Sequence, residues 1–224
     1  MELGSAGEAT TLSESEYVDV VKSVRAETKG KIPCVAGISV SSTARAVEMA
    51  RAIEELGCDG ILVATPPYNK PSQAGIVAHF KALRAASSLP LIAYNIPGRS
   101  GVAVASSTLG LLSREGVICG VKESSGSVDT IADTVLAVKP ECQVVAGEDS
   151  LLLASLAYGG VGAISACANV MPTEFVSLCE SFAAGNVAAA RQLQLDILPR
   201  IRSLFCESNP VPAKAVLALK GIIK

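Results

Sequence analysis

Lys122 is the residue whose position in this chain most clearly suggests chemistry. It ends the apolar run 117–121 and is followed by Glu123 and a Ser/Gly turn. The carboxyl end of a buried strand is where parallel α/β proteins place reactive groups. Apolar surroundings disfavour the ammonium form, and the free amine can attack a carbonyl carbon to form a Schiff base. The alternative is a surface lysine that reaches solvent and pairs with Glu123 or another carboxylate.

Further polar segments follow other apolar runs of the sequence. They contain Tyr68 (segment 65–68), Tyr94 and Arg99 (segment 94–99), Gly147 (segment 147–149) and Ser165 (segment 165–166). Phenol, guanidinium and hydroxyl groups can move protons and bind carboxylates, which a Schiff-base reaction requires. Each of these residues also has an ordinary structural role open to it, as a core aromatic, a solvated turn or a capped backbone.

The elements that must position these side chains alternate along the chain. Short β-rich runs are expected at 33–36, 60–64, 90–94, 117–122, 143–146 and 162–165. Helical patterns lie between them, and the first opens with Ser13 as N-cap and Glu16 three residues later. Further helices are expected at 42–56, 72–86, 105–113, 127–138, 151–158, 172–184, 187–205 and 211–223. This alternation predicts a parallel sheet covered by helices.

Two α/β architectures fit this periodicity: a doubly wound sheet and a (β/α)8 barrel. No Gly-x-Gly-x-x-Gly segment follows an early strand, as a dinucleotide-binding doubly wound sheet would require. The polar segments follow many strands rather than a single switch point. Residues from many strand ends converge at the carboxyl-terminal mouth of a barrel. The sequence therefore favours the barrel.

Composition excludes several classes of protein. The chain has 224 residues, 50% of them hydrophobic, which is typical of one globular domain. Its 19 Lys and Arg against 21 Asp and Glu leave a net charge of -2, and this predicts no nucleic-acid or membrane partner. Apolar stretches are far shorter than a membrane span, and residues 1–5 lack a signal-peptide pattern. We expect a cytoplasmic protein.

Cysteine and histidine usage gives no sign of a metal site. The seven cysteines are widely spaced without a Cys-x-x-Cys pair, which is typical of small core residues in a reducing compartment. They are Cys34, Cys58, Cys119, Cys142, Cys167, Cys179 and Cys206. His79 is the single histidine, so a metal site or a Ser-His-Asp triad would depend on it alone. We expect neither.

Four segments occur in the order and spacing of a known family. They are Gly4-Ser5-Ala6-Gly7-Glu8, Tyr68-Asn69-Lys70-Pro71-Ser72, Tyr94-Asn95-Ile96-Pro97-Gly98-Arg99-Ser100-Gly101 and Gly120-Val121-Lys122-Glu123. Together they resemble the dihydrodipicolinate synthase / N-acetylneuraminate lyase family of pyruvate-dependent class I aldolases. The likeness runs through essentially the whole chain. Arg99 resembles the synthase branch, because the sugar-acid lyases typically lack this arginine.

The resemblance implies a lyase that condenses pyruvate with L-aspartate 4-semialdehyde to 4-hydroxy-tetrahydrodipicolinate, in lysine and diaminopimelate biosynthesis. Two alternatives stay open: a related aldolase that uses another aldehyde, and a non-catalytic family member. A covalent imine on Lys122 would take the place of a cofactor. The small-molecule partners would be the two substrates, and the protein would be a homodimer or homotetramer.

The resemblance also implies a role for each matching residue. Lys122 would be the nucleophile and Tyr94 the proton shuttle. Ser5 stands where the family has a threonine that links two tyrosines, and Tyr68 matches the tyrosine that reaches the neighbouring subunit's site. The backbone N–H groups of Ser5 and Ala6 would bind the pyruvate carboxylate, although Ala6 lacks the hydroxyl of many relatives.

Three further positions complete the substrate-binding set that the resemblance implies. Arg99 would bind a carboxylate of the second substrate or of the product, for which its planar guanidinium is suited. Gly147 and Ile164, at two later strand ends, would contact substrate as well.

Against the family pattern, the chain begins after a further strand and helix and ends before a last helical stretch. We therefore expect one TIM-barrel domain over residues 1–224 that lacks the first β/α unit. Barrel units would fill about 1–170, and a C-terminal helical part would fill about 171–224. In the family, lysine inhibition uses polar residues whose counterparts here are Glu14, Tyr17, Ser41, Arg45 and Pro67. This set predicts weak or absent inhibition by lysine.

Overall fold

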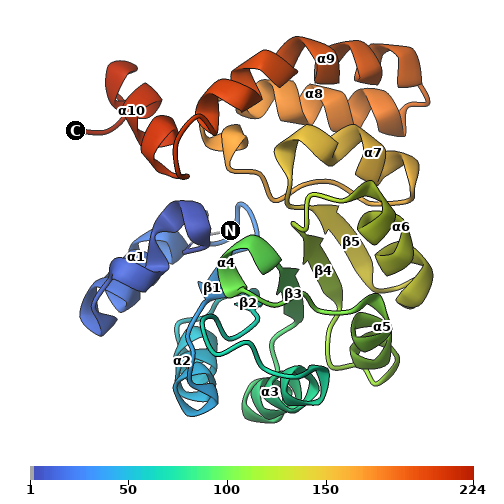
Figure 1. The fold of residues 1–224 in the computed structure, drawn as a ribbon. Helices are drawn as coiled ribbons and strands as arrows, with labels where there is room; N and C mark the ends of the chain where they lie inside the picture. The colour runs from blue at the N-terminus through green and yellow to red at the C-terminus, as the bar shows by residue number, and fades with distance from the viewer. Residues whose placement is uncertain (1–2) are drawn as a thin grey trace.

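A computed structural model describes residues 3–224 and has a five-stranded parallel sheet at its centre (Figure 1). The strands are β1 (Val35–Ile38), β2 (Gly60–Ala64), β3 (Leu91–Asn95), β4 (Gly120–Glu123) and β5 (Gln143–Ala146). They lie side by side in sequence order, each paired in parallel with the next. A doubly wound sheet would reverse this order at a switch point. The prediction of a barrel-type α/β fold is therefore confirmed.

Helices cover the outer side of this sheet. Figure 1 shows α2, α3, α5 and α6 around its convex side. The helices of this part are α1 (Glu14–Thr28), α2 (Thr43–Glu55), α3 (Gln73–Ala86), α4 (Pro97–Ser100), α5 (Ser106–Arg114), α6 (Val128–Ala137) and α7 (Leu152–Ala157). Ser13 forms the expected capping box with Glu16 at the start of α1. Short 3-10 turns occur at Ser5–Gly7, Ala9–Thr11, Asp149–Leu151 and Cys167–Asn169.

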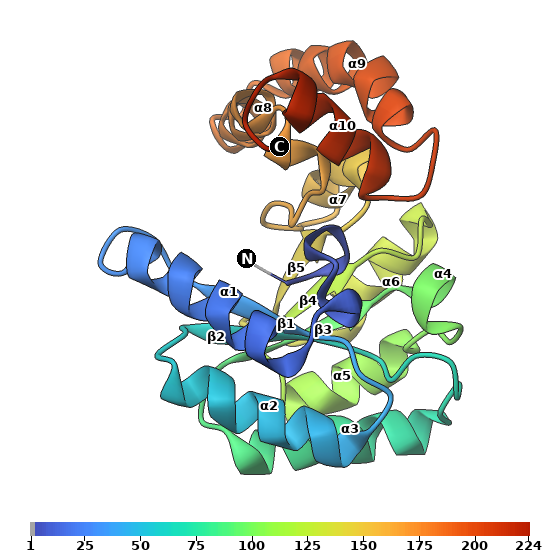
Figure 2. The ribbon, with the colours of Figure 1, turned by 90° about the vertical axis from the view of Figure 1, so that its left-hand side faces the viewer.

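The helices after the sheet gather on one side of the molecule, beyond β5 and α7 (Figure 2). They are α8 (Pro172–Ala183), α9 (Val187–Leu204) and α10 (Val211–Leu219). Their apolar faces form a second buried cluster, which includes Ala146 of β5, whereas Val144 of the same strand belongs to the main cluster around β1–β4. The two clusters thus meet at β5. The assignment of the whole chain to one domain stays a prediction.

Strand β1 spans Val35–Ile38 rather than 33–36, helix α10 ends at Leu219 rather than at 223, and two further elements differ from those expected. Segment 162–165 is not a full strand, because a single bridge, Ala146 to Ala163, joins it to β5. Gly160 and Gly162 explain this, since Gly162 has φ +156 and glycine weakens a strand. Strand β4 begins at Gly120 rather than at Val117, because the N–H of Val117 bonds to Leu112 O in the last turn of α5, at 2.9 Å. In the described part of the chain, no helix is long and apolar enough to cross a membrane.

Candidate active site

Lys122 lies inside the molecule rather than at its surface. It is 6% exposed, and its Nζ lies 4.1 Å from the centroid of the Tyr94 ring. The two residues are register partners across β3 and β4, so their side chains leave the same face of the sheet. Within residues 3–224 no carboxylate forms an ion pair with Lys122. The surface alternative for this lysine is therefore wrong.

Glu123 points away from Lys122 and has its own partners. Its Oε2 accepts a hydrogen bond from Asn95 Nδ2 at 2.8 Å, and its Oε1 accepts one from the Ser125 N–H at 2.7 Å. The Asn95 Oδ1 in turn accepts the Val104 N–H at 3.0 Å. Both Asn95 and Glu123 are fully buried. This polar network ties β3 to β4 and keeps the Glu123 carboxylate away from the Lys122 amine.

Gly147 gives Lys122 the space that it occupies. A Cβ at Gly147 would lie 2.9 Å from both Cγ and Cε of Lys122, and it would collide with Ser124 Oγ. The Gly147 N–H is fixed by a bond of 2.7 Å to the Glu123 carbonyl. The backbone therefore passes close to the lysine stem, which is a position that favours glycine.

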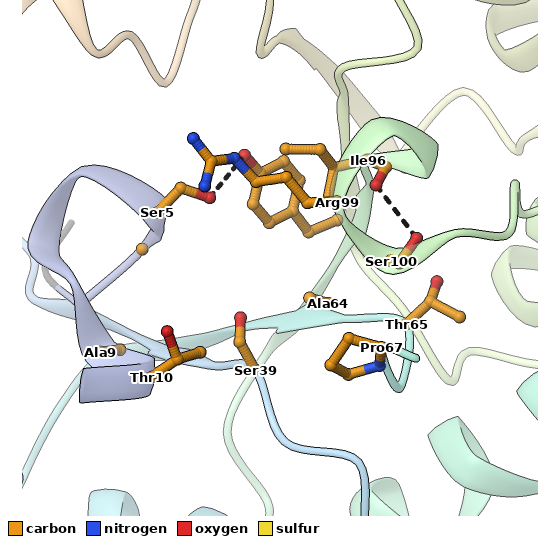
Figure 3. A pocket seen from close by; sticks show the side chains of 12 residues that line it. Ser5, Ala9, Thr10, Ser39, Ala64, Thr65, Pro67, Ile96, Arg99 and Ser100 are labelled. Carbon is orange, nitrogen blue, oxygen red and sulfur yellow. Dashed lines mark hydrogen bonds between the residues drawn. The ribbon is translucent and has the colours of Figure 1, made fainter. Parts of the chain in front are cut away.

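The segment before α1 brings Ser5 to Tyr94. A Cβ at Gly37 of β1 would collide with the Leu3 carbonyl, so this segment packs directly on the sheet. Ser5 Oγ then lies 3.4 Å from the Tyr94 hydroxyl, a hydrogen bond between residues 89 positions apart. Figure 3 shows Ser5 on one side of a cavity of about 220 Å³, which Tyr94 also lines, with Thr65 and Pro67 on the other side. Two of the expected proton-relay groups are therefore in contact.

A larger cleft of about 960 Å³ brings together most of the residues expected to act. Its lining includes Lys122, Tyr94, Ser5, Ala6, Arg99, Gly147 and Ile164. Arg99 donates a hydrogen bond from Nη2 to the Asn209 carbonyl at 2.8 Å, across to the segment before α10. Tyr68 is the exception, because it is 89% exposed, has φ +72 and does not line this cleft.

The sequence singled out the Gly147-Glu148-Asp149 segment without assigning a role to its acids. Asp149 is buried, and its Oδ1 accepts a hydrogen bond from the Ser165 hydroxyl. Burial raises the pKa of Asp149, although the Ser165 bond, Cys167 and the Lys122 charge act in the opposite direction. Burial and the Asp149 charge raise the pKa of Glu148, which lines the cleft. The site thus contains two acids whose pKa is raised above the ordinary value.

The comparisons with known proteins agree with this geometry. The model of the dihydrodipicolinate synthetase family matches residues 1–224. The chain belongs to this family. It is 39% identical over 219 residues to a 4-hydroxy-tetrahydrodipicolinate synthase of Oleidesulfovibrio alaskensis, covering 97% of this chain and 75% of that protein. The corresponding enzyme of Citrifermentans bemidjiense is 41% identical over 218 residues, covering 97% of this chain and 75% of that protein.

Solved structures of this family share the fold. The dihydrodipicolinate synthase of Thermotoga maritima superposes with a TM-score of 0.97 at 35% identity, covering 99% of this chain and 77% of that one. A second structure, described as the first monomeric dihydrodipicolinate synthase variant, also gives a TM-score of 0.97, at 34% identity, covering 100% of this chain and 76% of that one.

His79 takes no part in the site of this family member. It is buried in α3, where its Nδ1 lies 2.9 Å from Thr43 Oγ1 at the start of α2. Burial lowers the pKa of His79 to about 4. Among the described residues, no group of three or more His, Cys, Asp or Glu side chains could hold a metal ion.

The residues expected to determine lysine sensitivity lie together in the structure. Glu14, Tyr17, Ser41, Arg45 and Pro67 line one cavity of about 450 Å³ between α1 and α2. Arg45 forms ion pairs with Glu14 at 2.9 Å and with Glu48 at 3.0 Å. The structure thus has a cavity at this place, and weak or absent inhibition by lysine stays a prediction.

Proposed function

We propose that this chain is a 4-hydroxy-tetrahydrodipicolinate synthase, a lyase that condenses pyruvate with L-aspartate 4-semialdehyde through an imine on Lys122. One observation carries the proposal. The buried Lys122 amine lies over the Tyr94 ring, within a cleft that also holds the Ser5–Tyr94 hydrogen bond. The membership in the family and the names of its 38–41% identical relatives support the same reaction.

The first step is attack of Lys122 Nζ on C2 of pyruvate. The resulting carbinolamine loses water to give the imine, which requires a proton donor for the leaving hydroxyl. The Tyr94 hydroxyl is suited to this role because it is linked to Ser5 Oγ, which can pass the proton onward. The N–H groups of Ser5 and Ala6 would bind the pyruvate carboxylate at the start of the 3-10 turn.

The second step makes the carbon–carbon bond. Loss of a proton from C3 of the imine gives an enamine, whose C3 attacks the aldehyde carbon of the second substrate. Arg99 lines the same cleft and would bind the carboxylate of that substrate. The substrate's amino group then attacks C2, closes the ring and releases the Lys122 amine. The imine serves as the electron sink, so this route requires no other cofactor.

Tyr68 would act in a second copy of the chain. Its exposure, and its absence from the lining of the cleft, suit a contact across a two-fold interface. The small cavity beside Ser5 and Tyr94 offers a place for such a ring. We therefore infer a homodimer or homotetramer with a site completed by the partner copy.

Borohydride trapping tests the proposal. Incubation with pyruvate and borohydride should add one reduced pyruvate to the tryptic peptide that contains Lys122, and the Lys122→Ala variant should gain none. A panel of aldehydes, with aspartate semialdehyde first, then identifies the second substrate. An adduct elsewhere would refute the assignment of Lys122. Trapping with pyruvate but turnover only of another aldehyde would refute the synthase and favour a related aldolase.

A further inference from the structure

Two cysteines meet at the end of the sheet opposite to Lys122. Cys34 immediately precedes β1, and Cys58 lies just before β2. Their sulfur atoms are 3.8 Å apart, and the side chains are 2% and 5% exposed. Asp59, the residue after Cys58, holds the two strand starts together. Its N–H donates to the Cys34 carbonyl at 2.7 Å, and its Oδ2 accepts the Cys34 N–H at 2.8 Å.

We propose that Cys34 and Cys58 form an intrachain disulfide when the protein meets a hydroperoxide. Cys34 precedes Val35, the register partner of Gly60, whereas Cys58 is two residues before Gly60, so the separation of the sulfur atoms, and not the strand spacing, shows how near the two side chains are. The sulfurs must approach from 3.8 Å to the bond length of about 2.05 Å. Because both side chains already point toward each other across β1 and β2, rotation of the side chains can supply this movement.

The chemistry is a two-step oxidation by a named oxidant. One thiol, as its thiolate, attacks the peroxide oxygen, breaks the O–O bond and becomes a sulfenic acid, with release of water. The second thiol attacks that sulfur, expels a second water and forms the S–S bond. In total, two thiols and one hydrogen peroxide give one disulfide and two waters. Both cysteine sulfurs are oxidised and the peroxide oxygens are reduced.

The surroundings of Cys58 offer the oxidant an approach. Gly57 ends the turn after α2 with φ +77, and a Cβ there would lie 3.8 Å from Arg25 Nε. The guanidinium of Arg25 therefore borders the turn, where it also lies 3.6 Å from Asp59 Oδ2. Arg25 and Asp59 are partly exposed, so an oxidant would reach the buried pair from this side of the turn.

Another pair of cysteines has equivalent positions but different contacts. Cys119 immediately precedes β4 and Cys142 immediately precedes β5. The Cys119 thiol donates to the Leu91 carbonyl at 3.4 Å instead of facing its neighbour. Burial raises the pKa of both thiols. This pair is a matched control on the same end of the same sheet.

The bond would close a loop that contains β1 and α2. A crosslink of this kind restricts the unfolded chain and stabilises the fold. The disulfide would lie at the amino-terminal ends of the strands. Residues at this end of a barrel contribute to stability, whereas the catalytic residues lie at the carboxyl-terminal ends. We therefore expect oxidation to raise the Tm by several degrees and to leave imine formation on Lys122 unchanged.

To test this, the folded protein is treated with a small molar excess of hydrogen peroxide, and the remaining free thiols are then blocked with iodoacetamide. The protein is digested with trypsin without reduction. Mass spectrometry should find peptide 32–45 joined to peptide 52–81, two hydrogens lighter than their sum. The Cys119→Ser/Cys142→Ser double variant should keep this crosslink, and Cys58→Ser should lose it. Dithiothreitol should reverse both the crosslink and the rise in Tm.

Two results would overturn the inference. One is alkylation of both Cys34 and Cys58 after peroxide treatment, which would show that they remain thiols. The other is a sulfinic acid at either position without the crosslink, which would show that the second thiol does not reach the first. Both results can be read on the unmodified chain, so the inference does not depend on the folding of any variant.

Discussion

Replacement of Gly147 by alanine is a direct test of how the site holds Lys122. The added Cβ would lie 2.9 Å from Cγ and Cε of Lys122, whereas carbon atoms in contact are normally about 3.5–4.0 Å apart. Gly147 itself cannot retreat easily, because its N–H is bonded to the Glu123 carbonyl at 2.7 Å. The lysine stem must therefore move.

The collision with Ser124 is less serious than the one with Lys122. Ser124 Oγ is buried and has no hydrogen-bond partner among the described residues, so its rotation breaks no bond. Lys122 Cγ, in contrast, lies close to the backbone of β4 and moves only if the whole side chain changes rotamer. We expect Nζ to shift by about 0.5–1 Å. A displacement of about 1 Å at a reacting group costs on the order of a hundredfold in rate, which corresponds to about 2.7 kcal/mol.

The assay is the time course of borohydride trapping with saturating pyruvate, measured together with thermal unfolding. Gly147→Ala should trap pyruvate about a hundredfold more slowly and should still unfold cooperatively. Gly75→Ala is the matched control, because its Cβ would meet Pro71 Cβ at 3.4 Å and Ser72 Oγ at 3.5 Å, which are ordinary contacts. An unchanged trapping rate in folded Gly147→Ala would refute the argument that this glycine positions the lysine.

Three further predictions concern stability, regulation and assembly. Burial lowers the pKa of His79 from 6.5 to about 4. The free energy of unfolding should therefore be highest above pH 6.5, where His79 is neutral in both states, and should fall by about 3 kcal/mol as the pH drops to about 4. Urea unfolding against pH should show this slope, and His79→Gln should lack it. Arg45 forms ion pairs with both carboxylates of the cavity between α1 and α2, Glu14 and Glu48, and its charge repels a second cation. Millimolar lysine should therefore hardly inhibit the enzyme, and strong inhibition in a steady-state assay would contradict this. Inactive Tyr68→Phe mixed with inactive Tyr94→Phe should regain activity in hybrid dimers, and confirmed hybrids without recovery would disprove the shared site.

The arrangement of the fold could be predicted from the sequence because its strands carry strong local signals. β2 is buried along its whole length, and its residues 60–64 have the same limits in the sequence pattern and in the structure. The strand expected at 117–122 is harder to delimit, since Val117 and Ile118 are as apolar as a strand but belong to the turn after α5. Apolar character reports burial and does not by itself report backbone conformation.

The site could be predicted only in part, for a different reason. Lys122 stood out because a lysine follows an apolar run, and this is a local signal. The contact of Ser5 with Tyr94 joins residues 89 positions apart, and no pattern in the residues alone would have paired them; the resemblance to the family did so. The hydrogen bond between Asn95 and Glu123 could not be predicted from the sequence, because it depends on which face of the sheet each side chain leaves.

The alternation of side chains along β4 explains why Lys122 does not pair with Glu123, its neighbour in the sequence. Successive residues of a strand point to opposite faces, so Lys122 faces Tyr94 while Glu123 faces Asn95. Since Asn95 and the Ser125 N–H satisfy the Glu123 carboxylate, this buried acid does not draw the lysine toward it. A shift of one residue in the pairing of β4 would exchange the two faces and place the carboxylate in the cleft. The register of Tyr94 with Lys122 is therefore as much a condition for the proposed imine as the lysine itself.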